Sequence, residues 1–412
     1  MKFYKETNFQ ETPIGKIPKD WEVMRATDVA EYINGYPFSP KDWKTSGIPI
    51  IRIQNLNDPN AEFNFFDGEI DEIYKVKNGD LLLSWSASIG VYIWKRGDAV
   101  LNQHIFKVIP KPKVNKLFLY YALFLAIEQL KRRVHGSTMK HFRRGELETT
   151  FLPFPPLGEQ QKITEILSIV DEAIQKTDEI TAKGERLKKA LMNELLTGRI
   201  RVREENGRLS FHRETELQET EVGEIPRGWH VVKLGELIEM NHGERPEVIL
   251  HEGDVPIYGG GGLYGFTNTY LVDKPYVLIL ARVGKGSVGK VYLARGRVWV
   301  TDNAIYGYSK DPNGITTVYA YYWLLFDKTW IEKYVRRSAG GYAIITLNSL
   351  NNLKLPLPPL NEQKGITKII STIDKAVDLH YKGKERLERL KRGLMDLLLT
   401  GKVRVVDGDV GS

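Results

Sequence analysis

Cysteine is absent from the 412-residue sequence, and long hydrophobic runs are absent as well. Without cysteine, disulfide frameworks and thiolate zinc sites are excluded, and a reducing compartment, the cytoplasm, is expected. Residues 1–10 include Lys2, Lys5 and Glu6 and lack the apolar core of a signal peptide. The longest apolar stretch, Leu117 to Ile127, falls short of the roughly 20 residues that cross a bilayer. We therefore predict a cytoplasmic protein that does not span a membrane.

Catalytic signatures are scarce too. The eight histidines show no metal-ligand spacing. No Ser-His-Asp order is supported by the strand-turn-helix elbow that a hydrolase needs. The Pro-Pro-aromatic catalytic loop of a DNA methyltransferase is not found either. We predict that the protein is not an enzyme and that it binds neither metal nor cofactor.

A glycine-rich segment offers the main alternative. Gly284 to Val291 (GKGSVGKV) fits G-x-G-x-x-G and nearly fits a Walker A loop, so a nucleotide-binding enzyme is a second hypothesis. However, Val291 stands where a Ser or Thr should hold magnesium, and another strand-like run follows in place of a helix. The two lysines of this loop suit a DNA-backbone contact equally well. The run Gly259 to Gly262 is interpreted as a flexible turn, unless a helix follows it.

The charge balance favours a polyanionic partner. The 59 Lys and Arg residues outnumber the 52 Asp and Glu residues and give a net charge of +7. Such a balance suits nucleic acid, but many basic proteins bind none. The placement of the charges therefore decides more than their sum.

The sequence is an internal repeat with a period of about 200 residues. Three blocks recur in the same order, and from the second block to the third the two copies align without a gap. The pairs of blocks are Glu11–Val23 with Glu219–Val231, Leu152–Gln160 with Leu355–Gln363, and Leu196–Val202 with Leu399–Val405. Each half therefore consists of an opening motif, a variable region, a proline-rich turn and a long helix. We expect two related modules on one chain.

Each proline-rich turn predicts the start of a long helix. Pro155–Pro156 and Pro358–Pro359 cannot lie inside a helix, whereas Gly198 and Gly401 suit the residue that ends one. Each helix would then run for about 38 residues, or roughly 57 Å.

Apolar residues recur in these helices by threes and fours, which predicts a coiled-coil seam. Single helices of this composition are unstable in water, so we expect the two to pack against each other in antiparallel fashion. Pairing with a partner protein is the alternative, and a coiled-coil adaptor without DNA affinity is a third hypothesis for function. The seam is predicted at Ile166, Val170, Ile180, Leu187, Leu191, Leu195, Ile369, Ile373, Leu387, Leu390, Leu394 and Leu398.

The variable regions predict α+β domains with strongly curved mixed sheets. Strand-like runs bounded by Gly and Asp occur in both halves, and each region then has one hydrophobic helix that ends in an arginine pair. The runs are Ile48–Ile53, Asp80–Ser84, Val91–Trp94 and Ile105–Ile109, then Val255–Tyr258, Tyr276–Ala281, Lys290–Leu293 and Val298–Val300. The helices are predicted near Leu117–Arg133 and Val318–Arg337.

Hydrogen-bond donors lie at corresponding points of both variable regions. Phosphate oxygens need such donors, and base edges need the forked groups of Arg, Lys, Asn or Gln. Any single one could be a solvated surface side chain, but the two halves place them alike. The predicted DNA-binding residues are Arg52, Gln54, Asn55, Asn102, Gln103, His104, Ser137, Thr138, Lys140, Arg143 and Arg144 in the first half. In the second half they are Arg282, Lys285, Lys290, Asn303, Arg336, Arg337 and Tyr342.

Several motifs together resemble the specificity subunit of Type I restriction-modification systems. They are Gly15–Trp21, Pro49–Asn55, Gly79–Ser84, Asn102–Gln103 and Leu152–Gln160. The most specific part is the duplicated Pro-Leu-Pro-Pro-Leu-x-Glu-Gln block before a long helix, and the resemblance spans nearly the whole chain. The second half departs from the pattern at Asp302–Asn303, which stands in for Asn-Gln.

The resemblance implies two target-recognition domains held apart by two antiparallel helices. Each domain would read one half of a split, asymmetric site on double-stranded DNA, and the helices would fix the gap at about one DNA turn, roughly 34–36 Å. Two modification (methyltransferase) subunits, with or without restriction subunits, would hold the helices and carry S-adenosylmethionine and catalysis. We place the recognition domains at 1–154 and 206–357, the central spacer helix at 155–205 and the C-terminal spacer helix at 358–412.

Overall fold

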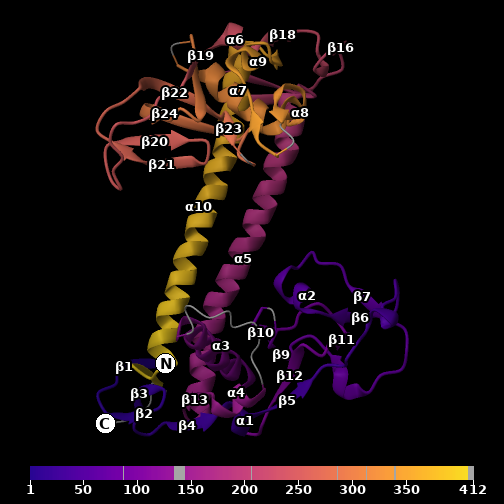
Figure 1. Ribbon diagram of the computed structural model, residues 1–412, viewed down its shortest axis with the longest axis vertical. Helices are drawn as coiled ribbons and strands as arrows, with labels where there is room; N and C mark the ends of the chain where they lie inside the picture. Colours follow the sequence, from indigo (N-terminus) through magenta and orange to yellow (C-terminus); the bar gives the residue numbers. More distant parts are fainter. Residues whose placement is uncertain are drawn as a thin grey trace. The chain divides into compact units, whose positions relative to one another are not determined.

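The computed structural model describes residues 1–86, 88–133, 144–205, 207–284, 286–311, 313–337 and 340–406. The chain divides into two compact units. The first unit comprises Met1–Thr177 and Gly383–Ser412, and the second comprises Asp178–Lys382. Each unit combines sheets with helices, which confirms the α+β class (Figure 1). Within the described ranges, no helix has both the length and the apolar character of a membrane span.

The first unit contains two four-stranded sheets. One is antiparallel, in the order β10 (Gly90–Ile93), β9 (Leu81–Ser84), β12 (Ile105–Pro110) and β5 (Ala30–Asn34). The other has the order β7 (Asn64–Phe66), β6 (Ile48–Ile51), β11 (Ala99–Leu101) and β8 (Lys75–Val76). In this second sheet β6 and β11 are parallel while the other pairs are antiparallel, so the predicted mixed sheet is confirmed. Helix α3 (Lys116–Arg133) packs against β10.

The second unit contains one six-stranded mixed sheet. Its order is β19 (Ile238–His242), β25 (Ala304–Ser309), β22 (Val272–Ala281), β24 (Val291–Val300), β20 (Val255–Gly259) and β21 (Gly262–Thr267). Strands β20 and β24 are parallel, as are β6 and β11 in the first unit. A small sheet has the order β23 (Val283–Gly284), β27 (Ala343–Ile344) and β26 (Arg336–Arg337).

Two predicted elements of the second unit differ from the structure. The runs Lys290–Leu293 and Val298–Val300 fall on one strand, β24, which begins at Val291. The left-handed Gly296 (φ +66°) and a register shift in β22 let the ladder continue past the glycine. The helix predicted near Val318–Arg337 is broken into α7 (Ile315–Phe326) and α8 (Thr329–Tyr334). The break lies at Asp327, whose carboxylate accepts hydrogen bonds from Thr329 N at 2.9 Å and Thr329 Oγ1 at 2.8 Å.

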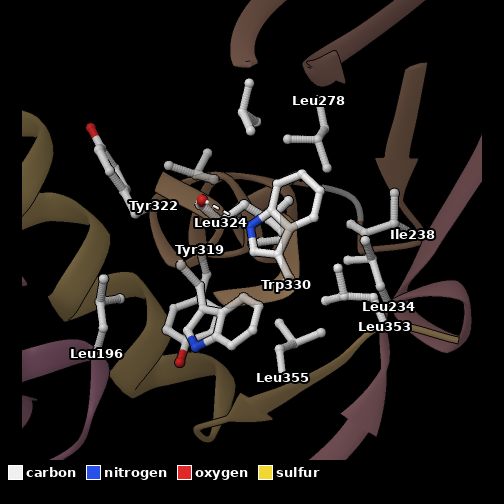
Figure 2. Packing of buried hydrophobic residues seen from close by; sticks show 14 of the residues in the cluster. Leu196, Leu234, Ile238, Leu278, Tyr319, Tyr322, Leu324, Trp330, Leu353 and Leu355 are labelled. Atoms are coloured by element: carbon white, nitrogen blue, oxygen red, sulfur yellow. Dashed lines mark hydrogen bonds between the residues drawn. The ribbon is translucent and has the colours of Figure 1, made fainter. Parts of the chain in front are cut away.

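The core of the second unit joins elements that are far apart in sequence. Figure 2 shows Tyr319 and Trp330, from α7 and α8, among Leu278, Leu355 and Leu196. The Tyr319 hydroxyl donates to the Pro356 carbonyl oxygen at 2.9 Å, so the buried phenol is satisfied. Because Leu196 belongs to the end of a long helix, that helix end is part of the core and is held firmly within the unit.

The two long helices start and end as the repeat predicts. Helix α5 spans Leu157–Leu196 and helix α10 spans Leu360–Leu398. Both start directly after a Pro-Pro pair, and the Gln160 and Gln363 amides donate to the carbonyl oxygens of Pro155 (2.9 Å) and Pro358 (2.8 Å). The helices end before Gly198 (φ +71°) and Gly401 (φ +68°), both left-handed.

Segments of α5 and α10 pack together inside each unit, and they run antiparallel there. In the second unit Lys188 forms an ion pair with Asp374, while Gly184 lies against Val377. In the first unit the repeat-related pair, Asp171 and Lys391, lies at 2.6 Å. From Lys188 back to Gly184 along α5, the partner moves forward along α10 from Asp374 to Val377. The two helices therefore run antiparallel in the second unit.

Three residues of the predicted seam do not lie in it. The side chains of Ile180, Leu187 and Leu390 are 48%, 53% and 51% exposed, so this part of the prediction is wrong. Near Leu187 the helices instead meet through the Lys188 ion pair and the close approach at Gly184. A search for apolar side chains alone overlooks the lysine. The remaining predicted seam residues are buried or half-buried: Ile166, Val170, Leu191, Leu195, Ile369, Ile373, Leu387, Leu394 and Leu398.

An arginine in the strand after each long helix ties the end of that helix to its unit. After α10, strand β29 (Val403–Val406) pairs with β1 (Lys2–Lys5), and Arg404 donates to Glu159 with two bonds of 2.8 Å. The same guanidinium donates to Asp20 and Glu6, and its hydrogen bond lowers the pKa of the Asp20 carboxyl. The Trp21 indole also donates to Glu159, at 3.0 Å.

The second unit repeats this arrangement within one hairpin. After α5, strand β14 (Ile200–Glu205) pairs with β15 (Arg208–Arg213), and Arg201 donates to Glu362 at 2.7 and 2.8 Å. The Trp229 indole donates to the same carboxylate at 3.0 Å. The first unit therefore assembles from the two chain ends what the second unit builds from a continuous segment.

Candidate nucleic-acid interface

In the second unit, predicted DNA-binding residues gather at the end of β22. Arg282 directly follows β22, and its backbone N donates to the Asn303 carbonyl oxygen at 3.0 Å. Its guanidinium donates to the Asp302 carbonyl oxygen, also at 3.0 Å. Since Asn303 lies in the loop between β24 and β25, the two predicted residues are neighbours in space although 21 positions apart in sequence (303 − 282).

A small sheet brings further cations to the same edge. Strand β23 continues from Arg282 and pairs with β27, which in turn pairs with β26, where Arg336 and Arg337 both lie exposed. Lys290 is exposed at the turn before β24, and Tyr342 is exposed next to β27. Several donors therefore share one edge of this unit, as phosphate and base contacts require. Lys285 lies outside the described residues.

The sequence prediction missed His242 at this edge. It ends β19 next to Gly243, and burial together with the nearby Arg282 charge lowers the pKa of its imidazole, which favours the neutral form. The repeat could have drawn attention to this position, because Gly243, the next residue, corresponds to Gly35 of the first half. At both glycines a Cβ would lie 2.2 Å from a carbonyl oxygen of the loop that precedes β25 or β12, so only glycine fits.

The first unit places its candidates at the carboxyl ends of the parallel strands β6 and β11. Arg52 follows β6, and Asn102 N donates to the Ile51 carbonyl oxygen at 3.2 Å, so the two predicted segments are adjacent. The Arg52 guanidinium stacks 4.6 Å from the centre of the Trp43 ring and donates to Asn64 Oδ1 at 2.8 Å. This support holds the arginine in place while leaving other N–H groups for a ligand.

Two predicted contact residues are structural instead. Asn55 is only 3% exposed, because its Oδ1 accepts from Arg52 N and its Nδ2 donates to the carbonyl oxygens of Ala61 and Glu62. Its amide caps helix α2 (Ile53–Asn57), which replaces the end of the strand predicted at Ile48–Ile53. Asn102 is 7% exposed inside its loop. Their burial argues against a base contact by either amide.

The neighbouring candidates remain compatible with a contact. Gln103 and His104 are half-buried beside Trp85, whose indole donates to the Gln103 carbonyl oxygen at 3.1 Å. The Oε1 of Gln103 and the Nδ1 of His104 are buried without a hydrogen-bond partner among the described residues. Gln54 is exposed and makes one long bond of 3.5 Å to the Glu62 carbonyl oxygen. Ser137, Thr138, Lys140 and Arg143 lie outside the described residues, and Arg144 begins α4 (Arg144–Thr149) with an undescribed side chain.

Backbone hydrogen bonds fix which residues of the two halves correspond. Tyr36 N donates to the Leu101 carbonyl oxygen (2.7 Å), and Glu244 N donates to that of Val300 (2.8 Å). Leu101 therefore corresponds to Val300, and counting onward pairs His104 with Asn303. The assumption that Asp302–Asn303 replaces Asn102–Gln103 is one residue out of register.

In the described part of the glycine-rich loop, strands and not a helix lie on both sides. Gly284 ends strand β23, and Val291 begins strand β24. A Walker A loop needs a helix N-terminus at this point to face the phosphates. Among the described residues there is also no group of three or more His, Asp or Glu side chains placed to hold a metal ion.

Comparison with known families gives one match in each half of the chain. The sequence model of the family described as "Type I restriction modification DNA specificity domain" matches residues 18–183 and 226–389. Together these segments cover well over half of the 412 residues.

Individual relatives agree with the family match. The chain is 29% identical to the type I restriction enzyme MjaVIII specificity subunit of Methanocaldococcus jannaschii, over 98% of this chain and 98% of that protein. It is 25% identical to the type I restriction enzyme EcoBI specificity subunit of Escherichia coli, over 87% of this chain and 80% of that protein. A crystal structure of the S subunit of a Type I restriction-modification system from M. genitalium shares the fold, with a TM-score of 0.65 and 17% identity over 92% of this chain and 96% of that one.

Proposed function

Because this chain belongs to the family of Type I restriction modification DNA specificity domains, we propose that it is the non-catalytic subunit that selects the DNA sequence for a Type I complex. Each unit would read one half of a two-part site on double-stranded DNA. Methylation, and cleavage where it occurs, would reside in partner subunits, and the proposal locates the protein in the cytoplasm with the DNA.

The duplicated edge is the observation that carries this proposal. In both units, exposed or half-buried donors stand where a pair of parallel strands ends, at β6 and β11 and at β20 and β24. Two similar edges that carry different side chains suit two half-sites of different DNA sequence. The recognition domains and spacer helices would have the boundaries 1–154, 155–205, 206–357 and 358–412.

Two modification subunits are the proposed partners, because each unit has the same groove. In the first unit a groove of about 730 Å³ is lined by Phe124 and Leu125 of α3 and by Lys391 of α10, among others. In the second unit a groove of about 690 Å³ is lined by Leu325 and Phe326 and by Lys188, the repeat counterpart of Lys391. One protein surface can fit both, which argues for two copies of one partner.

Exposed apolar side chains on the helices add to this partner surface. Leu187 and Leu390 occupy matching positions of the two helices and are each about half exposed. A partner that removes such a side chain from water gains free energy of binding. We propose that the modification subunits cover them.

The test is to map methylated adenines in DNA after co-expression of the chain with its cognate methyltransferase, for the wild type, Arg52→Ala and Arg282→Ala. We expect a two-part site. Arg52→Ala should lower discrimination about tenfold at one position of one half-site, and Arg282→Ala should do so in the other half-site. Equal weakening of both half-sites by either variant would contradict separate reading by the two units.

A further inference from the structure

The side-chain amide of Asn303 is held in one orientation. Its Oδ1 accepts a hydrogen bond from the backbone N of Gly260 at 2.9 Å and another from the Thr301 hydroxyl at 2.6 Å. A reversed amide would turn its NH₂ group toward the Gly260 N–H, so two donors would face each other. Because Asn303 is exposed, the fixed orientation leaves the Nδ2 donor for an outside partner.

The run of four glycines builds this support. Strand β20 ends at Gly259 and β21 begins at Gly262, so the hairpin turn lies directly over the loop that carries Asn303. A Cβ at Gly259 would lie 3.0 Å from Thr301 Oγ1 and 3.3 Å from Asn303 Oδ1. The Tyr292 hydroxyl donates to the Gly260 carbonyl oxygen at 3.3 Å, which gives the turn a second hydrogen bond. The glycines thus permit the close approach that the hydrogen bond requires.

The nearest predicted contact residue is also a pure donor. Arg282 follows β22 and donates to the Asp302 carbonyl oxygen, next to Asn303 in the chain. A guanidinium has no acceptor, and the Asn303 acceptor is already occupied twice. Arg282 and the Asn303 amide therefore present donors and no free side-chain acceptor of their own.

We propose that Asn303 is a specificity-determining residue of the second unit and that, with Arg282, it reads guanine and not adenine. This inference rests on the proposed function, that is, on DNA reading by this edge. An asparagine that reads adenine uses both ends of its amide, with the oxygen accepting from the N6 amine and the nitrogen donating to N7. Here the oxygen is taken. Guanine presents two acceptors, N7 and O6, in the major groove and suits the two donors.

The decisive variant is Asn303→Asp. It keeps an oxygen for the hydrogen bonds from Gly260 and Thr301 and replaces the exposed Nδ2 donor with an acceptor. Mapping of methylated sites after co-expression with the cognate methyltransferase should show that one guanine position of the second half-site falls about tenfold in preference. Cytosine, whose N4 amine is a donor, should gain at that position, and the first half-site should stay unchanged.

Two further variants keep the test sound. Asn352→Asp makes the same charge change in the same unit, directly after helix α9 (Leu347–Asn351). It should leave both half-sites unchanged. Thr301→Val removes one of the two bonds to Oδ1 without a charge change, so it should loosen the amide and weaken the guanine preference less than Asn303→Asp does.

The outcomes separate this inference from the proposed function. If Asn303→Asp weakens methylation at all sites equally, with no change of base preference, Asn303 contacts phosphate and the inference is overturned while DNA reading stands. An adenine at the Asn303-dependent position of the wild-type site overturns it as well. If wild-type co-expression gives no two-part methylated site, the proposed function itself fails.

Discussion

At the residue level, two repeat-related arginines each form ion pairs with more than one carboxylate. Arg404 is 5% exposed and faces Glu159, Asp20 and Glu6. Arg201 faces Glu362 and Glu214 in the second unit. In each unit the arginine lies in the strand that follows one long helix, and a glutamate comes from the first turn of the other helix. A buried charge of this kind is stable only while its partner is present.

Replacing Arg404 by methionine should therefore destabilise the protein strongly. The change leaves the buried Glu159 carboxylate without its cation, at a cost of about 3–5 kcal/mol in the free energy of unfolding. Denaturant unfolding of Arg404→Met and of the matched variant Arg201→Met measures the cost in each unit. Adding Glu159→Gln to Arg404→Met should recover part of the loss, because the uncharged amide still accepts from Trp21. If the double variant is no more stable than the single one, the unpaired charge is not the cause.

Residue type alone could not separate contact residues from structural ones. Asn55 and Asn102 carry the forked groups that base edges need, yet their amides serve the fold, as their burial shows. Asn303 carries the same group and presents it outward. The difference arises from the backbone around each amide, and the sequence pattern does not contain it. The repeat does reveal Gly35 and Gly243, and these glycines mark the loops that lie at the two edges.

At the scale of elements, the helix boundaries could be predicted while the contact face could not. Proline pairs and left-handed glycines fix the ends of α5 and α10 by backbone stereochemistry that depends on few neighbours. The contact face depends on long-range partners: Lys188 turns inward because Asp374 faces it, and Gly184 lies inside because Val377 needs the space. Leu187, the more apolar choice, is left outside.

Leu187 and Leu390 provide the test at this scale. We expect Leu187→Ser and Leu390→Ser to change the free energy of unfolding by no more than about 0.5 kcal/mol, because both side chains are exposed. Each should weaken binding of the methyltransferase subunit about tenfold in a calorimetric titration, since an apolar contact is lost. Leu195→Ser, at a fully buried leucine, is the control and should cost about 3 kcal/mol or more in stability. Equal destabilisation by Leu187→Ser and Leu195→Ser would place Leu187 in the core after all.

At the scale of the whole molecule, the internal repeat made two modules predictable from sequence. The family match falls in each half, and the structure divides into two compact units. The sequence could not show that the first unit closes with both chain ends, since the pairing of β1 with β29 joins residues about 400 positions apart in the chain. Local patterns carry no information about such pairing.

We propose that α5 and α10 set the spacing at which the two units read DNA. The most direct measurement is the methylated motif produced with the cognate methyltransferase when one heptad is inserted after Thr177 and a matching heptad after His380. A heptad adds about 10 Å of helix, close to three base-pair steps. We expect both half-sites to stay unchanged and the gap between them to lengthen by about three base pairs. An unchanged gap in an active complex would contradict this proposal.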